Sequence, residues 1–266
     1  MDARDGSLVT FPEFGGRHVE PRTLYVRRSP DPPAGAPLLI MQDGQDVVGD
    51  GPDGGDGWRL AEAMEHLSRL PGVRVPTVAA LASTSNRAGE YFPEKALTGP
   101  KARQVYQHHV DRIFKPCADD YLSFLVAELM PFMRDSFDVS LQDVTIAGCS
   151  RGALLSVYAM AEYPELFTRA GCLSPHWPHG DGIVIDWLEM HMPSPEGRRV
   201  YFDYGDQGLD AEYEPYQRRM DRLMEAAGFT REQNWITRSF PGHGHSAEYW
   251  AQRLPGALEF LLGVAQ

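Results

Sequence analysis

The sequence has few cysteines, fewer basic than acidic residues, and no long hydrophobic run. Its three cysteines, none in a C-x-x-C motif, are too few for a disulfide framework. A reducing compartment such as the cytoplasm fits this cysteine usage best. The charged N-terminus has no apolar segment typical of a signal peptide, and nowhere do about 18 uncharged apolar residues run together. We therefore expect a cytoplasmic protein with no membrane-spanning segment.

The charge balance also excludes some partners. With 37 acidic and 25 basic residues the formal net charge is −12, which opposes binding to nucleic acid or to an anionic membrane surface. Glycine (26 residues) and proline (21 residues) are plentiful, so loops should be numerous. No internal repeat or linker divides the 266 residues, and we expect residues 1–266 to form a single domain.

Short apolar runs alternate with amphipathic stretches along the chain. The runs predict strands at Leu24–Arg28, Leu38–Met41, Thr77–Ala82, Val144–Ala147, Ala170–Ser174, Val200–Asp203 and Trp235–Phe240. Apolar residues spaced by three and four predict helices around Leu60–Leu67, Leu122–Phe132, Tyr216–Leu223 and Trp250–Leu261. This alternation is typical of an α/β fold with a mostly parallel central sheet and helices on both faces, whose functional residues follow the carboxyl ends of the strands.

Two long segments have no clear periodicity. They are Gln42–Trp58, which is rich in Gly and Asp, and Ser83–Arg112. Loops of this length usually carry function, so we expect both to border a substrate site.

The string Val144 to Ala159 contains the motif G-x-S-x-G between an apolar strand and a helix. In this context the serine, Ser150, occupies a sharp turn, and side chains at Gly148 or Gly152 would collide with the neighbouring elements. The hydroxyl would project into a cleft beside the start of the helix. Ser150 is therefore the candidate nucleophile, and the alternative is a tight turn with a buried serine.

A serine nucleophile needs a base, and two histidines compete for that role. His243 and His245 share the loop between the last predicted strand and the last predicted helix. His176 and His179 follow another predicted strand, and His176 is a candidate for substrate binding. Their H-x-x-H spacing lacks a defined third ligand, so a metal site is the weaker interpretation and we expect none.

The base needs an acid, which should follow the strand at Val200–Asp203. Asp206 lies just beyond this strand, and Asp210 lies a few residues further on. Asp206 could be only a turn residue, and Asp210 only a helix cap. Both remain candidates for the acid, with a slight preference for Asp210.

An oxyanion hole requires two backbone N–H groups that point at one position. Arg151, directly after the candidate nucleophile, would supply one; Gln45, reached through a close turn at Gly44, would supply the other. The side chains of Arg151 and Arg87 could favour a negatively charged substrate, although a salt bridge to a nearby carboxylate would explain each equally well.

These segments together resemble the esterase branch of the α/β-hydrolase superfamily, which includes enterochelin esterases, feruloyl esterases and S-formylglutathione hydrolase. The similar blocks, in order, are LLIMQDGQ, NRAGEYFP, YLSFLVAELMPF, GCSRGALLSVYAMAEYPELF, AGCLSP, YFDYGDQGLDAEYEPYQ and GHGHSAEYWAQRL. The second block contains Glu90, which we add to the substrate-binding candidates.

The resemblance implies a serine esterase without a cofactor. It favours His245 over His243 as the base, because the distance to Trp250 and Arg253 matches the family's H-x-x-x-x-W-x-x-R ending. It places the family's aspartate on Asp210, while the family's usual Thr-Glu is replaced by Asp206-Gln207. The implied reaction is hydrolysis, through an acyl-enzyme, of a small or carbohydrate-linked ester.

Two other functions use the same features. An acyltransferase would have the same triad with an alcohol other than water as the acceptor, and a binding protein could retain the scaffold without catalysis. The aspartates between Asp43 and Asp56 match neither of the usual calcium-loop patterns, so we interpret them as a solvated loop. We expect the partner to be a small-molecule ester, and a homo-oligomer stays open.

Overall fold

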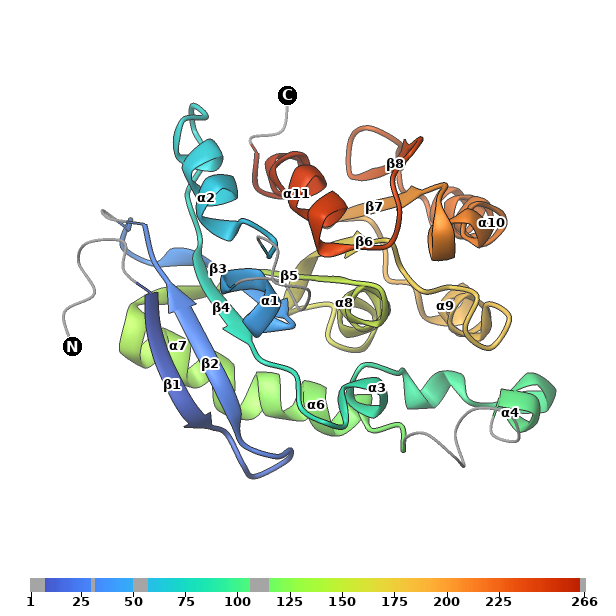
Figure 1. Cartoon of the computed structure of the whole chain (residues 1–266), viewed down its shortest axis with the longest axis horizontal. Helices are drawn as coiled ribbons and strands as arrows, with labels where there is room; N and C mark the ends of the chain where they lie inside the picture. The colour runs from blue at the N-terminus through green and yellow to red at the C-terminus, as the bar shows by residue number, and fades with distance from the viewer. Residues whose placement is uncertain (1–7, 30–31, 50–56, 106–114, 264–266) are drawn as a thin grey trace.

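The computed structural model describes residues 8–29, 32–49, 57–105 and 115–263. One sheet of eight strands runs through these residues in the order β1-β2-β4-β3-β5-β6-β7-β8 (Figure 1). The strands are β1 (Leu8–Phe14), β2 (Arg22–Arg27), β3 (Ala36–Gln42), β4 (Thr77–Leu81), β5 (Val139–Cys149), β6 (Phe167–Leu173), β7 (Arg199–Gly205) and β8 (Trp235–Phe240). The six strands from β4 to β8 in this order pair in parallel. At the other edge β2 pairs antiparallel with both β4 and β1.

Helices connect most of these strands. The α-helices are α1 (Gly44–Val48), α2 (Leu60–Ser68), α3 (Arg87–Glu90), α4 (Gly99–Val105), α6 (Ala118–Phe124), α7 (Met130–Phe137), α8 (Arg151–Glu162), α9 (Ile183–His191), α10 (Glu214–Ala226) and α11 (Ala247–Leu262). A π-helical turn, Leu125–Leu129, joins α6 to α7, and short 3₁₀ turns lie at Glu94–Ala96 (η1) and Gly208–Glu212 (η4).

The sheet separates two apolar cores, and alternate residues of β3 face opposite cores. Leu38 and Ile40 pack with the helices α6, α7, α8 and α9, whereas Leu39 and Met41 pack with α2 and α11. Figure 1 shows these two sets of helices on opposite faces of the sheet. The predicted mostly parallel sheet with helices on both faces is confirmed.

Strand β1 and helix α9 were missing from the predictions, as were the short helices of the two aperiodic segments. Strand β1 contains Pro12, which weakens a strand signal and is tolerated here because β1 lies at the edge of the sheet. Helix α9 lies inside the segment from Pro175 to Pro195, where its nine residues are apolar on most sides because the helix is largely buried. No helix of the described residues is long and apolar enough to cross a membrane.

The two long aperiodic segments contain short helices. Gln42–Trp58 forms α1, and the side chain of Trp58 is buried against Trp250, with ring centroids 5.8 Å apart. Ser83–Arg112 forms α3, η1 and α4. Residues 50–56 and 106–112, and with them Asp50, Asp53, Asp56 and the pair His108–His109, lie outside the described residues.

Candidate active site

Ser150 lies at the sharp turn between β5 and α8. Its φ of 56° and ψ of −119° fall in a region that L-residues with a side chain rarely adopt. A Cβ at Gly148 would lie 2.3 Å from Gln42 Oε1 and 2.7 Å from the carbonyl carbon of Gly152, so glycine is required there. The collision expected at Gly152 is wrong, because a Cβ there would make ordinary contacts, the nearest at 3.4 Å with Gln42 Cβ. The strand, strained turn and helix predicted from the motif are all present.

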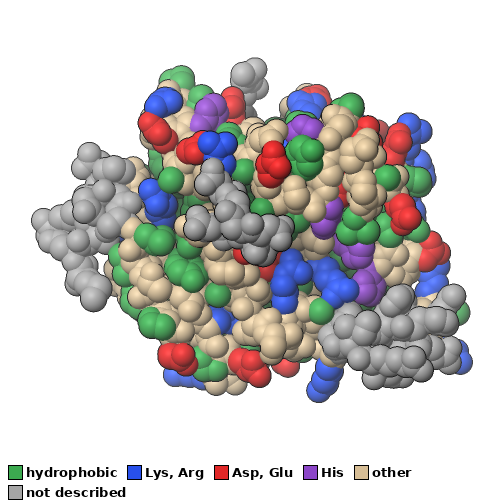
Figure 2. Space-filling view, viewed as in Figure 1, with side chains coloured by type: hydrophobic (Ala, Val, Ile, Leu, Met, Phe, Trp, Pro, Cys, Tyr) green, Lys and Arg blue, Asp and Glu red, His purple; other side chains and the backbone are tan. Residues whose placement is uncertain are grey.

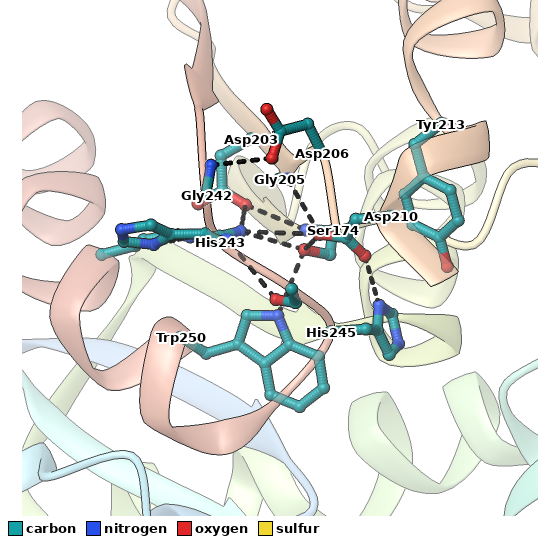
Figure 3. Close-up of polar contacts among 12 residues, drawn as sticks. Ser174, Asp203, Gly205, Asp206, Asp210, Tyr213, Gly242, His243, His245 and Trp250 are labelled. Atoms are coloured by element: carbon teal, nitrogen blue, oxygen red, sulfur yellow. Dashed lines mark hydrogen bonds and ion pairs between the residues drawn. The ribbon is translucent and has the colours of Figure 1, made fainter. Parts of the chain in front are cut away.

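His245 is held by a carboxylate from another loop. Its Nδ1 lies 2.6 Å from Asp210 Oδ1, and the two side chains are 14% and 0% exposed (Figure 3). The imidazole packs edge-on against Trp250 and Tyr213, with centroid distances of 4.9 and 5.7 Å. These contacts fix the ring orientation and leave Nε2 directed away from Asp210.

The two candidate acids occupy different environments. Asp210, in η4, also accepts hydrogen bonds at Oδ2 from Ser174 Oγ (2.7 Å) and the Gly205 N–H (2.8 Å). Burial raises the pKa of Asp210, but the hydrogen bonds from His245, Ser174 and Gly205 outweigh burial and hold it below its usual value. The carboxylate is therefore ionised at neutral pH.

Asp206 points elsewhere. It is fully exposed, and its Oδ1 accepts hydrogen bonds from the Gly242 N–H (2.7 Å) and Gln207 Nε2 (2.8 Å). These bonds lower its pKa and tie the loop after β7 to the loop after β8, as Figure 3 shows. The structure brings Asp210, and not Asp206, to His245.

The competing histidine His243 also lies away from Asp210. Its ring stacks on Phe240 and Tyr249, and its Nδ1 accepts a hydrogen bond from Arg253 Nε at 3.3 Å. Its backbone carbonyl accepts hydrogen bonds from the N–H groups of Asp206 and Gln207, both at 3.0 Å. His243 therefore joins the two loops that carry Asp210 and His245.

A chain of contacts connects Ser150 to His245. The His176 N–H donates to the Ser150 carbonyl (3.2 Å), and His176 Nδ1 lies 2.7 Å from the Tyr213 hydroxyl, whose ring contacts His245. Burial, followed by the charges of Arg151 and His245, lowers the pKa of His176 to about 4, so this imidazole is neutral at pH 7. Among the described residues Ser150 Oγ makes no hydrogen bond, as is common before substrate tightens a site.

The turn after β3 is held rigidly beside this site. A Cβ at Gly44 would lie 2.7 Å from the Ala80 carbonyl, so the backbone passes close to β4. Both ends of the Gln45 side chain bond Ser83: Oε1 accepts from its N–H (3.0 Å), and Nε2 donates to its hydroxyl (2.9 Å). The first N–H groups of α1 have no partner within this helix, which keeps Gln45 N–H a candidate oxyanion donor.

Arg87 and Glu90 make ion pairs within the protein. Arg87 donates from Nε and Nη2 to the two oxygens of Asp43, at 2.5 and 2.8 Å. Burial lowers the pKa of Arg87, but Asp43 more than offsets this and the net shift is upward. Glu90, 2% exposed, receives two hydrogen bonds from Arg22 at 2.7 and 2.8 Å. Its carboxylate is therefore paired with Arg22 inside the protein.

Arg151 occupies a different position, at the first turn of α8. Its Nη2 lies 3.3 Å from His179 Nδ1, and burial together with the charge of Arg87 lowers its pKa. Figure 2 shows basic and histidine side chains gathered near the centre of one face, over α3 and α8. Arg87 in this group is paired with Asp43, so its charge is balanced within the protein.

Sequence interpretation missed one functional candidate, Ser174. It follows β6 with a φ of 43°, and its hydroxyl bonds Asp210. A single serine after a strand forms no recognisable motif. Its position at the carboxyl end of a predicted strand, where functional residues gather in such sheets, was the one indication in the sequence. For metals, no group of three or more His, Cys, Asp or Glu residues gathers within the part of the chain that the structure describes.

Comparison with known proteins identifies related chains. A family model described as "Putative esterase" matches residues 20–261. The uncharacterized protein YbbA of Bacillus subtilis is 24% identical over 251 residues, which cover 91% of this chain and 92% of that protein.

Solved structures share the fold. The enterobactin esterase FES of Shigella flexneri superposes with a TM-score of 0.68 at 19% identity over 95% of this chain, and this chain spans 58% of that protein's length. The BES protein of Bacillus cereus gives 0.71 at 15% identity, with 97% and 95% of the two chains covered. Enterobactin hydrolase IroE gives 0.65 at 17% identity, with 96% and 94% covered. The predicted α/β-hydrolase fold of the esterase branch is confirmed.

Proposed function

The chain belongs to the "Putative esterase" family and is a carboxylic ester hydrolase, and on this premise we propose that Ser150, His245 and Asp210 form its catalytic triad. One observation carries the proposal: His245, 2.6 Å from Asp210, is connected through the Tyr213 ring and His176 to the backbone of Ser150, the serine held at a φ of 56° directly before a helix. Nucleophile, base and acid then come from the loops after β5, β8 and β7.

The hydrogen bonds determine which imidazole nitrogen carries the proton. An ionised Asp210 can only accept, so His245 Nδ1 must be the donor, and Nε2 of the neutral ring is left as an acceptor. In the proposed reaction Nε2 takes the Ser150 proton as Oγ attacks the ester carbonyl, then gives it to the leaving alcohol. Water repeats the sequence on the acyl-enzyme and releases the acid.

The negative charge that forms on the carbonyl oxygen needs donors. We assign the N–H groups of Arg151 and Gln45 to this role, because one follows the nucleophile and the other lies in the turn after β3. The Asp43–Arg87 ion pair and the two Gln45–Ser83 hydrogen bonds support this turn. In this proposal Arg87 holds the turn after β3 in place and does not bind the substrate.

The proposed substrate is a small ester that carries an anionic group. Arg151 directly follows Ser150, and its guanidinium Nη2 lies 3.3 Å from His179 Nδ1, whose ring centroid lies 5.8 Å from that of His176. An anion bound there would gain a charge-assisted hydrogen bond in a partly buried setting. FES and IroE are described as acting on enterobactin, and this chain shares their fold at under 25% identity.

The nucleophile is tested by labelling with a fluorophosphonate and mapping the adduct. We expect the label on Ser150, and loss of both labelling and 4-nitrophenyl acetate hydrolysis in Ser150→Ala. Cys149→Ala is the matched control, because burial raises the pKa of the adjacent Cys149 thiol well above its usual value and keeps it an inert thiol. Full activity of Ser150→Ala, or loss of labelling only in Cys149→Ala, would refute the assignment.

The substrate class is tested with two 4-nitrophenyl esters of matched acyl length, one ending in a carboxylate and one in a methyl group. We expect wild type to prefer the anionic ester and Arg151→Met to lower that preference roughly tenfold. The substitution keeps the backbone N–H of residue 151, so hydrolysis of the neutral ester should change little. An equal loss for both esters would exclude anion recognition by this side chain.

The three cysteines Cys117, Cys149 and Cys172 are all free in the structure. This agrees with the reducing environment inferred from their number, and we propose a cytoplasmic location on that basis.

A further inference from the structure

The Ser174 hydroxyl lies behind the Asp210 carboxylate, on the side away from His245. Ser174 is 0% exposed, and its Oγ is within hydrogen-bond distance of three groups: Asp210 Oδ2 (2.7 Å), Arg253 Nη1 (3.0 Å) and Trp250 Nε1 (3.2 Å). A hydroxyl has one proton to donate and two lone pairs to accept with. All of its hydrogen-bonding capacity is therefore used.

The chemistry of the three partners fixes the direction of these bonds. The guanidinium of Arg253 and the indole N–H of Trp250 can only donate, so both lone pairs of the Ser174 oxygen are occupied. The one hydroxyl proton must then go to Asp210 Oδ2. Since Oδ2 also accepts from the Gly205 N–H, no room is left for a proton on this oxygen, and Asp210 is held ionised and oriented.

Arg253 supplies a buried positive charge behind this contact. Its side chain is 0% exposed; Nη1 lies 3.2 Å from Asp203 Oδ1 and 3.8 Å from Asp210 Oδ2. Asp203 is also fully buried and receives hydrogen bonds from the Ser174 N–H and the Tyr201 hydroxyl. One guanidinium thus stands between two carboxylates, and only one of them, Asp210, contacts His245.

We propose that Ser174 and Arg253 are positioning residues, which orient the Asp210 carboxylate through the Ser174 hydroxyl and moderate its negative charge as seen by His245. This proposal rests on the triad proposed above. Without the hydroxyl or the guanidinium, Asp210 would be freer to rotate and would stabilise the protonated imidazole more strongly. The base would then be available only at higher pH.

The backbone of Ser174 supports a functional role. Its φ of 43° lies in the left-handed region, which costs a serine conformational energy and costs glycine almost none. A glycine at this position would serve the turn at least as well, so the side chain contributes something that the turn does not need. The three hydrogen bonds of the hydroxyl account for it.

The charged and titratable groups around His245 come from several elements. Asp210 and Tyr213 face it from η4 and the start of α10, and His176 from the loop after β6. Arg253 of α11 and Asp203 and Tyr201 of β7 lie behind Asp210. Of these, Arg253 is the positive group paired with both buried carboxylates.

The first experiment uses Ser174→Gly, which removes the hydroxyl and relieves the strained backbone. We expect kcat to fall roughly 10- to 100-fold with KM within about twofold, and the acid limb of the kcat/KM profile to move to higher pH. The matched control is Ser156→Ala, which removes another fully buried serine hydroxyl, one that donates to the Gly152 carbonyl at 2.8 Å. A Ser174→Gly enzyme with wild-type kcat and an unmoved acid limb would overturn the proposal.

The second experiment compares Arg253→Lys with Arg253→Gln. Lysine keeps the charge, so we expect its acid limb to stay near that of wild type, while glutamine moves the limb to higher pH. If both variants fold and the acid limb of the kcat/KM profile lies at the same pH in each, the proposed role of the Arg253 charge is refuted. Should Arg253→Gln fail to fold, Ser174→Gly and Arg253→Lys still decide the question.

NMR titration of the His245 ring separates this inference from the proposed triad. The ring signals are assigned by their loss in His245→Gln, and we expect them to titrate at higher pH in Ser174→Gly than in wild type. If they do so while Ser150→Ala stays active, the triad fails and the positioning network stands. If the titration does not move in Ser174→Gly, the positioning network fails whatever the outcome for Ser150.

Discussion

Two buried charged regions flank the candidate nucleophile, and they are built differently. The Asp43 side consists of Arg22, Asp43, Arg87 and Glu90, in which each carboxylate is paired with its own guanidinium through two hydrogen bonds. The His245 side consists of Ser174, Asp203, Asp210, His245 and Arg253, in which one guanidinium is shared by two carboxylates and the third partner is an imidazole.

The difference separates fixed charges from a movable proton. On the Asp43 side each carboxylate is bound by a guanidinium, which has only donors. On the His245 side one partner is an imidazole, which can both accept and donate a proton in the proposed reaction. The Asp43 side is therefore suited to holding the backbone of a site in place, and the His245 side is suited to acid–base chemistry. Substitutions on the two sides test this difference.

The largest effect is expected for Asp210→Asn. The amide can donate to His245 Nδ1 and favours the wrong tautomer, so kcat should fall by about 10³- to 10⁴-fold. Asp206→Asn is the matched control on the same loop, and its activity should stay within about twofold of wild type. Steady-state kinetics on a 4-nitrophenyl ester measures both. A comparable loss in Asp206→Asn would mean that the acid has been misassigned.

On the Asp43 side, Arg87→Ala should affect stability more than proton transfer. It leaves the Asp43 carboxylate, 3% exposed in its side chain, without its partner. Because Arg87 is itself a third exposed, we expect the free energy of unfolding to fall by about 2–3 kcal/mol, below the usual cost of a fully buried pair. The acid limb of the activity profile should stay in place.

Urea unfolding measures the stability of Arg87→Ala, with Arg69→Ala as its control. Arg69 pairs with Glu65 on the exposed face of α2, so its loss should cost under about 0.5 kcal/mol. A shift of the acid limb in Arg87→Ala would contradict the separation of roles between the two sides.

An effect on stability of similar size, but dependent on pH, is expected through Asp203. Burial raises its pKa to about 6, and Arg253 offsets this only in part. Between about pH 4 and pH 6 the folded state therefore binds more protons at Asp203 than the unfolded state, so the contribution of this group to stability falls as pH rises. Asp203→Asn removes that contribution.

Unfolding measured from pH 4 to pH 7 tests this point. Relative to wild type, the stability of Asp203→Asn should increase with pH by about 2–3 kcal/mol across the window. The lost partner of Arg253 adds an offset that is similar at every pH, so the slope is the informative quantity. Parallel stability curves would show that Asp203 is ionised throughout.

Much of the fold was predictable because hydrophobic spacing reports burial directly. Trp235–Phe240 was predicted with its observed bounds, and the helix expected around Trp250–Leu261 is α11. β1 could not be found, because an edge strand with one exposed side and a proline carries little pattern. The same holds for α9, whose burial on most sides removes the periodic contrast between faces.

Within the site, local chemistry was predictable and distant pairing was not. The sequence identifies Ser150 through its motif, in which the turn requires Gly148, and it limits the base and the acid to two candidates each. It does not distinguish Asp206 from Asp210, because both follow the same strand and lie only four positions apart. The sequence also does not show that Arg87 pairs with Asp43, 44 residues away in the chain, or that Glu90 pairs with Arg22, 68 residues away.

The order of the central strands, the strained serine turn and the short loops that carry a histidine and an acid could be inferred from the sequence, since each depends on residues that are neighbours in the chain. The 2.6 Å contact between Asp210 and His245, and the placement of Ser174 and Arg253 behind Asp210, arise from the tertiary structure. Those contacts join the ends of three strands, β6, β7 and β8, and the helix α11, whose separation along the sequence says nothing about their distance in space. The parallel sheet brings them to one edge, and buried hydrogen bonds then select among the candidates.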